Sequence, residues 1–175
     1  MELKKAILER RSIRAFSPNT IDKGILQEIL TAGIHSPTAG NIQPWAFFCV
    51  SDPKKVHRII TISPGMLSNP VTIICICSDQ DRAFKKAGKG GKILALMDCA
   101  MAAQNIMLRA FDLGIGSCVI RSFNQDAVRE LLDAPTHFQP ELLVTLGYSA
   151  VAKPAAPKRR MNVIYWDGYK EGKNG

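Results

Sequence analysis

The sequence lacks the short motifs that mark several common classes of enzyme. It contains no P-loop, and Gly114-x-Gly116 lacks the third glycine of a dinucleotide fingerprint and follows a predicted helix instead of a strand. No apolar run approaches the roughly 18 residues of a membrane span. The first residues, which include Glu2, Lys4 and Lys5, contain no apolar secretion signal. We therefore expect a cytoplasmic protein without a membrane segment.

Metal-binding and nucleophile motifs are also missing. The five cysteines form no C-x-x-C pair and lie mostly in apolar surroundings, which favours reduced core thiols. Cys75 and Cys77 would share one face of a strand, but the second ligand pair of a zinc site is absent. The three histidines have neither ligand spacing nor a neighbouring nucleophile. We expect no metal.

The composition is that of a globular chain with an excess of positive charge. Of 175 residues, 46% are apolar and 22% are charged, which suits one domain spanning residues 1–175. The net charge of +8 fits nucleic acid, an acidic surface or an anionic small ligand. Because the chain has no aromatic-rich strand motif or recognition helix, we expect no nucleic-acid partner. The basic residues cluster at 4–14, 82–92 and 153–160, where they can converge on one phosphate or form separate solvated faces.

Apolar spacing predicts helices that interleave with strands. Helices are predicted at 2–9, at 20–34 with Thr20 as N-cap, at 93–113, in a short stretch from 53, and in a stretch capped by Asn124. Strands are predicted at 45–50, 71–77, 116–120 and 142–146. The chain opens with two helices and lacks a regular βαβ cadence, which favours an α+β fold with four or five strands. Residues 153–175 are expected to form an extended arm.

Three segments carry more specific expectations. Helix 2–9 should turn Leu3, Ala6 and Ile7 inward. Segment 80–92 is basic and contains three glycines, so we expect a loop that acts as a lid, as a clamp for a nicotinamide phosphate or as disordered surface. Helix 93–113 is apolar or small on nearly all sides, which suits a core helix and equally a dimer seam.

The first candidate site is the arginine cluster at 10–14. Arg10, Ser12 and Arg14 alternate, so an extended backbone would point them to one side. Two guanidinium groups with a hydroxyl and backbone amides match the needs of a phosphate monoester. The alternative is a solvated basic turn. Lys158 and Arg160 in the tail join this site only if the tail folds back onto it.

The second candidate site is the polar loop 36–43. Asn41 and Gln43 each present a donor and an acceptor that can pair with the edge of a heterocycle, and Gly40 permits close approach of the backbone to a ring. The alternative is an Asx-type loop that satisfies its own backbone.

Four motifs together resemble the nitroreductase family, in order and at its spacing. They are Arg10-Arg11-Ser12-Ile13-Arg14-Ala15-Phe16, Ser36-Pro37-Thr38-Ala39-Gly40-Asn41-Ile42-Gln43-Pro44-Trp45, Leu113-Gly114-Ile115-Gly116-Ser117-Cys118, and Leu146-Gly147-Tyr148 followed by Pro157-Lys158-Arg159-Arg160. The resemblance implies an α+β sandwich with a central mixed, mostly antiparallel sheet flanked by helices. It also implies a homodimer built on helix 93–113, with FMN at the subunit interface and NADH or NADPH as reductant.

The resemblance also assigns expected roles to residues. The phosphate and ribityl end of FMN would contact Arg10, Arg11, Ser12 and Arg14, with Arg14 reaching toward the flavin pyrimidine, and with Lys158 and Arg160 closing on the phosphate. A loop that often comes from the partner subunit would supply Ser36, Pro37, Thr38, Asn41 and Gln43. The segment along the ring near N5 would be Val119, Ile120, Arg121 and Ser122, and Trp166 would lie on an arm that wraps the partner. The flavin would carry the chemistry, so we expect no catalytic side-chain acid or nucleophile.

The sequence departs from the family pattern on the expected substrate side. Larger members often have an acidic residue and glycine where this chain has Arg121-Ser122, and this chain lacks their inserted helices. The expected acceptor is a nitroaromatic, a quinone or a similar small molecule. A flavin-destroying or dehalogenating enzyme on the same fold, and a flavin-binding protein without turnover, stay open.

Overall fold

The computed structural model describes residues 2–152, 154–160 and 163–168, and its centre is a four-stranded sheet. The strand order is β1 (Trp45–Val50), β2 (Thr72–Asp79), β4 (Phe138–Gly147) and β3 (Gly116–Ile120), and each neighbouring pair is antiparallel. An isolated bridge between Ser12 and Ser117 adds a parallel contact at the β3 edge. The predicted mixed, mostly antiparallel sheet of an α+β fold is therefore confirmed.

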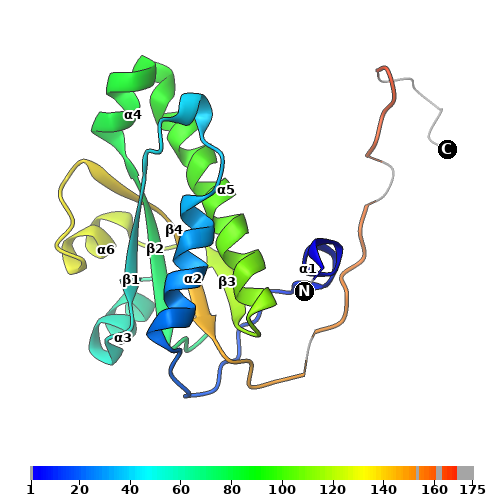
Figure 1. The fold of residues 1–175 in the computed structure, drawn as a ribbon. Helices are drawn as coiled ribbons and strands as arrows, with labels where there is room; N and C mark the ends of the chain where they lie inside the picture. The colour runs from blue at the N-terminus through cyan, green and yellow to red at the C-terminus, as the bar shows by residue number, and fades with distance from the viewer. Residues whose placement is uncertain (1, 153, 161–162, 169–175) are drawn as a thin grey trace.

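Helices cover both faces of the sheet (Figure 1). The α-helices are α1 (Leu3–Glu9), α2 (Lys23–Ile34), α3 (Pro53–Thr61), α4 (Gln80–Ala87), α5 (Gly91–Asp112) and α6 (Gln125–Leu131), with short 3₁₀ turns η1 (Ala39–Asn41) and η2 (Gly88–Gly90). The longest helix, α5, packs with α2 on one face, while α3 and α6 pack on the other.

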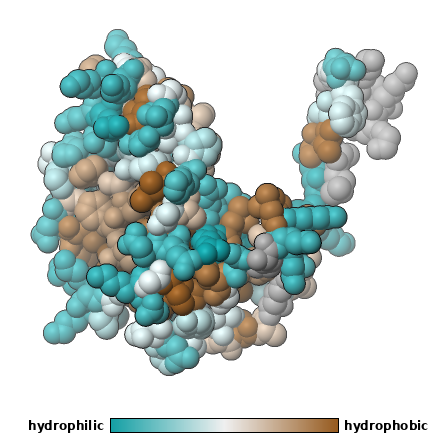
Figure 2. All heavy atoms as spheres, in the orientation of Figure 1, coloured by the Kyte–Doolittle hydropathy of each residue, from teal (hydrophilic) through white to brown (hydrophobic). Residues whose placement is uncertain are grey.

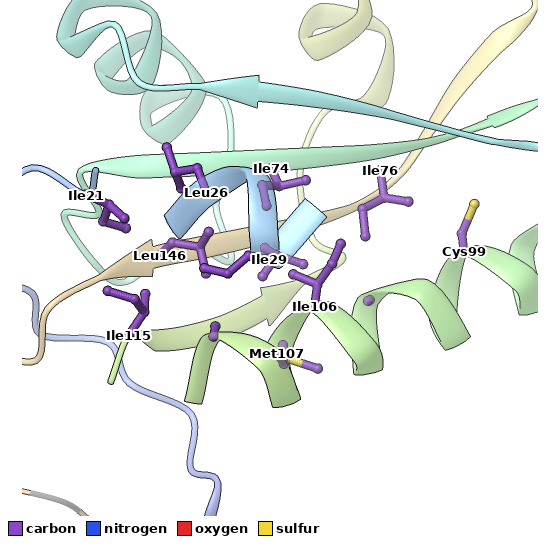
Figure 3. Close-up of a cluster of buried hydrophobic side chains, with 13 residues drawn as sticks. Ile21, Leu26, Ile29, Ile74, Ile76, Cys99, Ile106, Met107, Ile115 and Leu146 are labelled. Atoms are coloured by element: carbon purple, nitrogen blue, oxygen red, sulfur yellow. The ribbon is translucent and has the colours of Figure 1, made fainter. Parts of the chain in front are cut away.

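Strand β2 divides the core between these two layers. Its residues Thr72 to Ser78 are all buried, as predicted for a strand covered on both faces. Ile74 and Ile76 join Ile29 of α2 and Ile106 of α5, whose side chains meet in Figure 3. Ile73, Cys75 and Cys77 point to the opposite face, toward the α3 and α6 layer, because successive strand residues alternate between faces.

The expected loop at 80–92 is wrong, because the structure forms α4, η2 and the first turn of α5 there. Asp79 caps α4 by accepting a hydrogen bond from the Arg82 N–H at 2.9 Å. Gly88, with φ 58°, makes the turn after α4. A Cβ on Gly91 would lie 2.3 Å from the Ala83 carbonyl oxygen, so glycine lets α4 and α5 touch. The glycines thus serve a tight helical turn instead of a mobile loop.

The start of α2 also differs from the prediction. Its N-cap is Asp22, whose Oδ1 accepts from the Gly24 N–H at 2.7 Å, and not Thr20. Aspartate is as good a cap as threonine or better, and only the backbone path decides which residue meets the open N–H groups.

Helix α1 does not bury its predicted apolar stripe. Ala6 is buried, but Leu3 is 69% exposed and Ile7 is 57% exposed. Figure 1 draws α1 apart from the sheet, beside α5, and Figure 2 shows apolar surface at that place. The amphipathic pattern is present, but this chain alone does not cover it.

One helical stretch is long and apolar enough to cross a membrane by length and composition, which the sequence interpretation did not anticipate. It runs from Gln80 to Asp112, and 44% of its most apolar window is buried within the protein. The buried positions of α5, such as Ile106 and Ala103, contact the sheet and α2 as those of a core helix do.

Candidate functional site

The segment at 10–14 is extended and lies along the edge strand β3. The Ile13 N–H donates to the Ser117 carbonyl at 3.0 Å, and Ile13 is buried against Gly116, where a Cβ would approach the Ile13 side chain to 2.9 Å. With Ile13 turned inward, Ser12 stays partly exposed and Arg14 exposed, as alternation requires. The predicted extended geometry of this cluster is confirmed.

Arg10 lines a hollow of about 170 Å³ near the C-terminal end of α5, which we call the Arg10 hollow. Its other walls include Phe111, Gly114 and Ser117. The Nη1 atom of Arg10 is buried and has no hydrogen-bond partner among the described residues, and the same holds for the Ser117 hydroxyl. Because an unpaired buried guanidinium nitrogen is costly, this wall suits an anion that would accept its hydrogen bond.

Arg11 also lines the Arg10 hollow, and its Nε is buried without a hydrogen-bond partner among the described residues. Its Nη1 donates to the carbonyls of Leu8 at 2.8 Å and Arg10 at 2.9 Å, at the C-terminal end of α1. An arginine at this position satisfies open helix carbonyls. Arg11 therefore has a structural contact that the sequence interpretation missed.

Arg14 lines a second hollow, of about 200 Å³, which we call the Arg14 hollow. The predicted ring segment lies on the same wall, and the full described lining is Arg14, Gly65, Leu67, Ser68, Cys118, Val119, Ile120, Arg121 and Ser122. This lining contains two guanidinium groups and no carboxylate. The structure thus brings together Arg14 and the 119–122 segment.

The turn at 63–68 is a part of this hollow that sequence reasoning missed. The Gly65 N–H donates to the Ser122 carbonyl at 3.0 Å, and a Cβ on Gly65 would lie 2.7 Å from that of Ser122. The run of turn-forming residues was visible in the sequence, but nothing local indicates which segment the turn touches.

The loop at 36–43 has an unusual backbone. Gly40, Asn41 and Gln43 all have positive φ, at 54°, 54° and 52°. Two non-glycine residues in the left-handed region so close together carry strain of the kind that concentrates at ligand sites. The Ser36 hydroxyl in the same loop is buried without a hydrogen-bond partner among the described residues.

The loop also satisfies some of its own polar groups. Gln43 donates from Nε2 to the Asn41 Oδ1 at 2.8 Å, and its backbone N–H donates to the Thr38 hydroxyl at 3.1 Å. Asn41 and Gln43 are exposed, as is Pro37. The internal bonds of the Asx-type alternative are therefore present, and the outward edges of both carboxamides stay accessible.

The 36–43 loop and the arginine cluster lie at opposite ends of α5. The Ala39 N–H donates to Asp98 near the beginning of α5, whereas the Arg10 hollow includes Phe111 near its end. Thirteen residues at 1.5 Å per residue separate these points by about 20 Å. One chain does not bring the two predicted clusters together.

The tail residues do not close on the arginine cluster within this chain. Lys158 and Arg160 are exposed, and among the described residues neither makes a hydrogen bond or ion pair to Arg10, Ser12 or Arg14. Trp166 is 82% exposed, and Figure 1 shows the described part of the tail leaving the sheet. The chain just before the tail pairs with the residue that follows the cluster, because the Ala150 N–H donates to the Ala15 carbonyl at 3.0 Å.

Comparisons with known proteins agree with this architecture. The model of the Nitroreductase family matches residues 7–69 and 61–148. A candidate NADH dehydrogenase/NAD(P)H nitroreductase of Archaeoglobus fulgidus is 37% identical over 154 residues, covering 84% of this chain and 85% of the relative. An FMN reductase (NADPH) of Bacillus subtilis is 25% identical, covering 92% and 71%. The solved structure of an FMN-dependent nitroreductase from Clostridium difficile superimposes with a TM-score of 0.83 at 24% identity, covering 95% and 100%.

Proposed function

The chain belongs to the nitroreductase family, and on this premise we propose that it is an FMN-dependent oxidoreductase that takes hydride from NADH or NADPH. Its acceptor in this proposal is a nitroaromatic, a quinone or a similar small molecule. The relatives named as NAD(P)H nitroreductase and FMN reductase support the reaction class. The single observation on this chain that carries the cofactor proposal is the buried, unpaired Nη1 of Arg10 beside an open hollow.

When bound, FMN supplies the redox chemistry by accepting hydride at N5 and passing electrons to the acceptor. Arg10 and Ser12 would hold the phosphate, since Arg10 has an unused buried donor. Strand β3 leads from the Arg10 hollow, which includes Gly116, to the Arg14 hollow, which includes Val119. An elongated ligand with its anionic end at Arg10 would therefore reach the Arg14 hollow with its other end.

Arg14 would provide positive charge at the electron-rich edge of the flavin. Its guanidinium is exposed in a hollow whose described lining has no carboxylate to neutralise it. A fixed cation favours a ligand that becomes more negative on reduction. The same lining offers neither histidine nor carboxylate, so the residues here would bind and orient and would not transfer protons.

The second half of the proposed site comes from another copy of the chain. The 36–43 loop lies about 20 Å along α5 from the arginine cluster. Two α5 helices packed antiparallel across a twofold axis would place the beginning of one beside the end of the other. That arrangement would bring Ser36, Pro37, Thr38, Asn41 and Gln43 of one copy to Arg10 and Arg14 of the other.

Exposed apolar side chains support this homodimer. On α5 they are Ile93 at 63% and Met97 at 55%, with Leu96 and Met101 beside them at 39% and 37%. Leu3 and Ile7 of α1, which lies beside the later part of α5 in Figure 1, are also uncovered. Exposed apolar side chains along one face of a helix, as at Ile93, Met97 and Met101, are typical of a subunit interface. In the proposal, the arm carrying Lys158, Arg160 and Trp166 lies across the partner.

The visible spectrum of the purified protein, followed by anaerobic titration with each nicotinamide, tests the proposed function. We expect a yellow protein whose flavin absorption is bleached by NADH or NADPH and restored by a nitroaromatic or quinone. A preparation that is colourless and binds no added FMN would contradict cofactor binding. Bound FMN that neither nicotinamide reduces would indicate a flavin-binding protein without turnover.

A further inference from the structure

The side chain of Arg121 lines two hollows on the surface. One is the Arg14 hollow. The other, of about 510 Å³, lies between the start of α5 and the β4 strand, and we call it the Glu141 hollow; its lining is Gln80, Lys92, Ile93, Leu96, Arg121, Gln125, Asp126, Gln139 and Glu141. The Arg121 side chain is 50% exposed. Its guanidinium can therefore meet a small molecule that occupies the Arg14 hollow and extends into the larger one.

A network that includes the buried Glu141 carboxylate lies beside this guanidinium. The Glu141 side chain is only 8% exposed, and its Oε2 lies 3.6 Å from Arg121 Nη2. The Ser78 hydroxyl donates to Glu141 Oε1 at 2.8 Å, and Gln80 Nε2 donates to that hydroxyl at 2.5 Å. The Phe123 ring centroid is 6.0 Å from Arg121 Cζ. A side chain already ordered by such contacts loses less conformational entropy when it binds a ligand.

The two hollows that Arg121 lines have an excess of positive charge, because their carboxylates are already paired. Glu141 is engaged by Arg121 and Ser78, and Asp126 pairs with Arg129 at 2.8 Å. Lys92 in the lining of the Glu141 hollow and Arg14 in the Arg14 hollow are cations without an ion pair among the described residues. A guanidinium has five N–H donors, so one contact with Glu141 leaves donors for a second anion.

We propose that Arg121 is a specificity-determining residue that receives an anionic group, a carboxylate or a phosphate, of the small molecule exchanging electrons at this site. This inference rests on the proposed function and adds the chemical class of its substrate. Two sources share the chemistry: the phosphates of the nicotinamide nucleotide and a carboxylate on the acceptor. Glu141 is the positioning residue that orients the guanidinium. A guanidinium that only balances the buried Glu141 charge would give no such selectivity.

The test compares charged and uncharged substrates in pairs, so that any general effect on the flavin cancels. The acceptor pair is 4-nitrobenzoate and 4-nitrobenzyl alcohol, and the reductant pair is NADPH and the uncharged 1-benzyl-1,4-dihydronicotinamide. In at least one pair, Arg121→Ala should lower the charged-to-uncharged ratio of kcat/KM by about tenfold or more, the loss expected for a hydrogen bond to a charged group. Arg121→Lys should restore part of the ratio because it restores the charge. The pair that responds identifies the source of the anion.

A binding measurement without turnover supplies the second readout. Calorimetric titration with 4-nitrobenzoate and with 2′,5′-ADP should give a dissociation constant that rises in Arg121→Ala and rises with salt in the wild type. The matched control is Arg58→Ala, which removes an exposed arginine from α3 outside both hollows. Arg58→Ala should leave ratios and dissociation constants as in the wild type.

Wild-type ratios and wild-type dissociation constants in Arg121→Ala would overturn the proposal. Arg121→Gln provides the same test if the alanine variant does not fold. A wild-type protein that holds no flavin, or whose flavin no nicotinamide reduces, would contradict the proposed function instead. The calorimetric titration would still decide whether Arg121 binds the anion.

Discussion

The backbone N–H of Ala39 donates to the Oδ1 of Asp98 at 3.1 Å, which ties the strained 36–43 loop to helix α5. Asp98 is 1% exposed, and its other carboxylate oxygen has no hydrogen-bond partner among the described residues. This contact and the Arg82 Nε–H, which donates to the Ile42 carbonyl at 2.5 Å, both anchor a loop that we assign to the cofactor site.

The Asp98 carboxyl gives a prediction about pH. Burial is the main cause that raises its pKa above the ordinary value, with the Ala39 hydrogen bond opposing it. A raised folded-state pKa means that folding favours the protonated form, so this group's contribution to stability falls as pH rises from the unfolded pKa through the folded one. Asp98→Asn should remove that part of the pH dependence in urea unfolding. If the free energy of unfolding depended on pH in Asp98→Asn as it does in the wild type, the attribution of this effect to Asp98 would be wrong.

Replacing the same residue by alanine tests the anchor itself. Asp98→Ala leaves the Ala39 N–H without its acceptor, at a cost of about 1–3 kcal/mol. We expect lower stability together with weaker FMN binding, whereas Asp98→Asn should retain more of the binding because its carbonyl can still accept. If Asp98→Ala bound FMN as tightly as the wild type does, the loop would keep its place without this contact.

Arg10 and Arg11 both line the Arg10 hollow, but Arg11 also donates to carbonyls at the end of α1. Arg10→Ala should weaken FMN binding by about tenfold or more, since a charged hydrogen bond is worth about 1.5–3 kcal/mol. Arg11→Ala should lower stability by about 1 kcal/mol, because Arg11 donates to carbonyls at the end of α1, and it should weaken FMN binding less than Arg10→Ala because part of its guanidinium is already paired. Fluorescence titration with FMN and urea unfolding measure the two effects, and the opposite pattern would contradict both assignments.

Charge introduced on the exposed face of α5 should break the proposed dimer. Met97→Glu places a carboxylate at a side chain that is 55% exposed in the single chain, so the monomer should fold while association weakens. His57→Glu, at an exposed position of α3, is the control. Sedimentation velocity should show a monomer only for the α5 variant, with loss of bound flavin if the partner's loop completes the site. A dimer that survives Met97→Glu would contradict the α5 interface.

The contact between α4 and α5 gives a prediction that uses two adjacent glycines. A Cβ at Gly91 would lie 2.3 Å from the Ala83 carbonyl oxygen, whereas a Cβ at Gly90 would meet nothing within 4 Å. Gly91→Ala should therefore destabilise the protein by about 1–3 kcal/mol, as overpacking does, while Gly90→Ala should be nearly neutral. Thermal unfolding of the two variants measures the difference, and similar melting temperatures would contradict the packing.

Local patterns in the sequence determined most of the secondary structure and the chemistry of the candidate site. The β-branched run of β2 and the spacing of α5 were recognisable because strand and helix periodicities are properties of neighbouring residues. The alternation that turns Ile13 inward and Arg14 outward has the same origin. The arginine, serine and carboxamide types likewise indicated an anionic ligand with a polar edge.

Only the tertiary structure decided which of these segments meet. Residues 80–92 are helical, although a loop was expected there. The helices can form because Gly91 packs closely against Ala83, a contact that no local pattern encodes. The tertiary structure placed loop 36–43 and Arg10 at opposite ends of α5, and it set Arg121 against the buried Glu141 from a strand twenty residues away in sequence. The physical reason is that residue spacing fixes the face on which a side chain lies, whereas its partners depend on how whole elements pack.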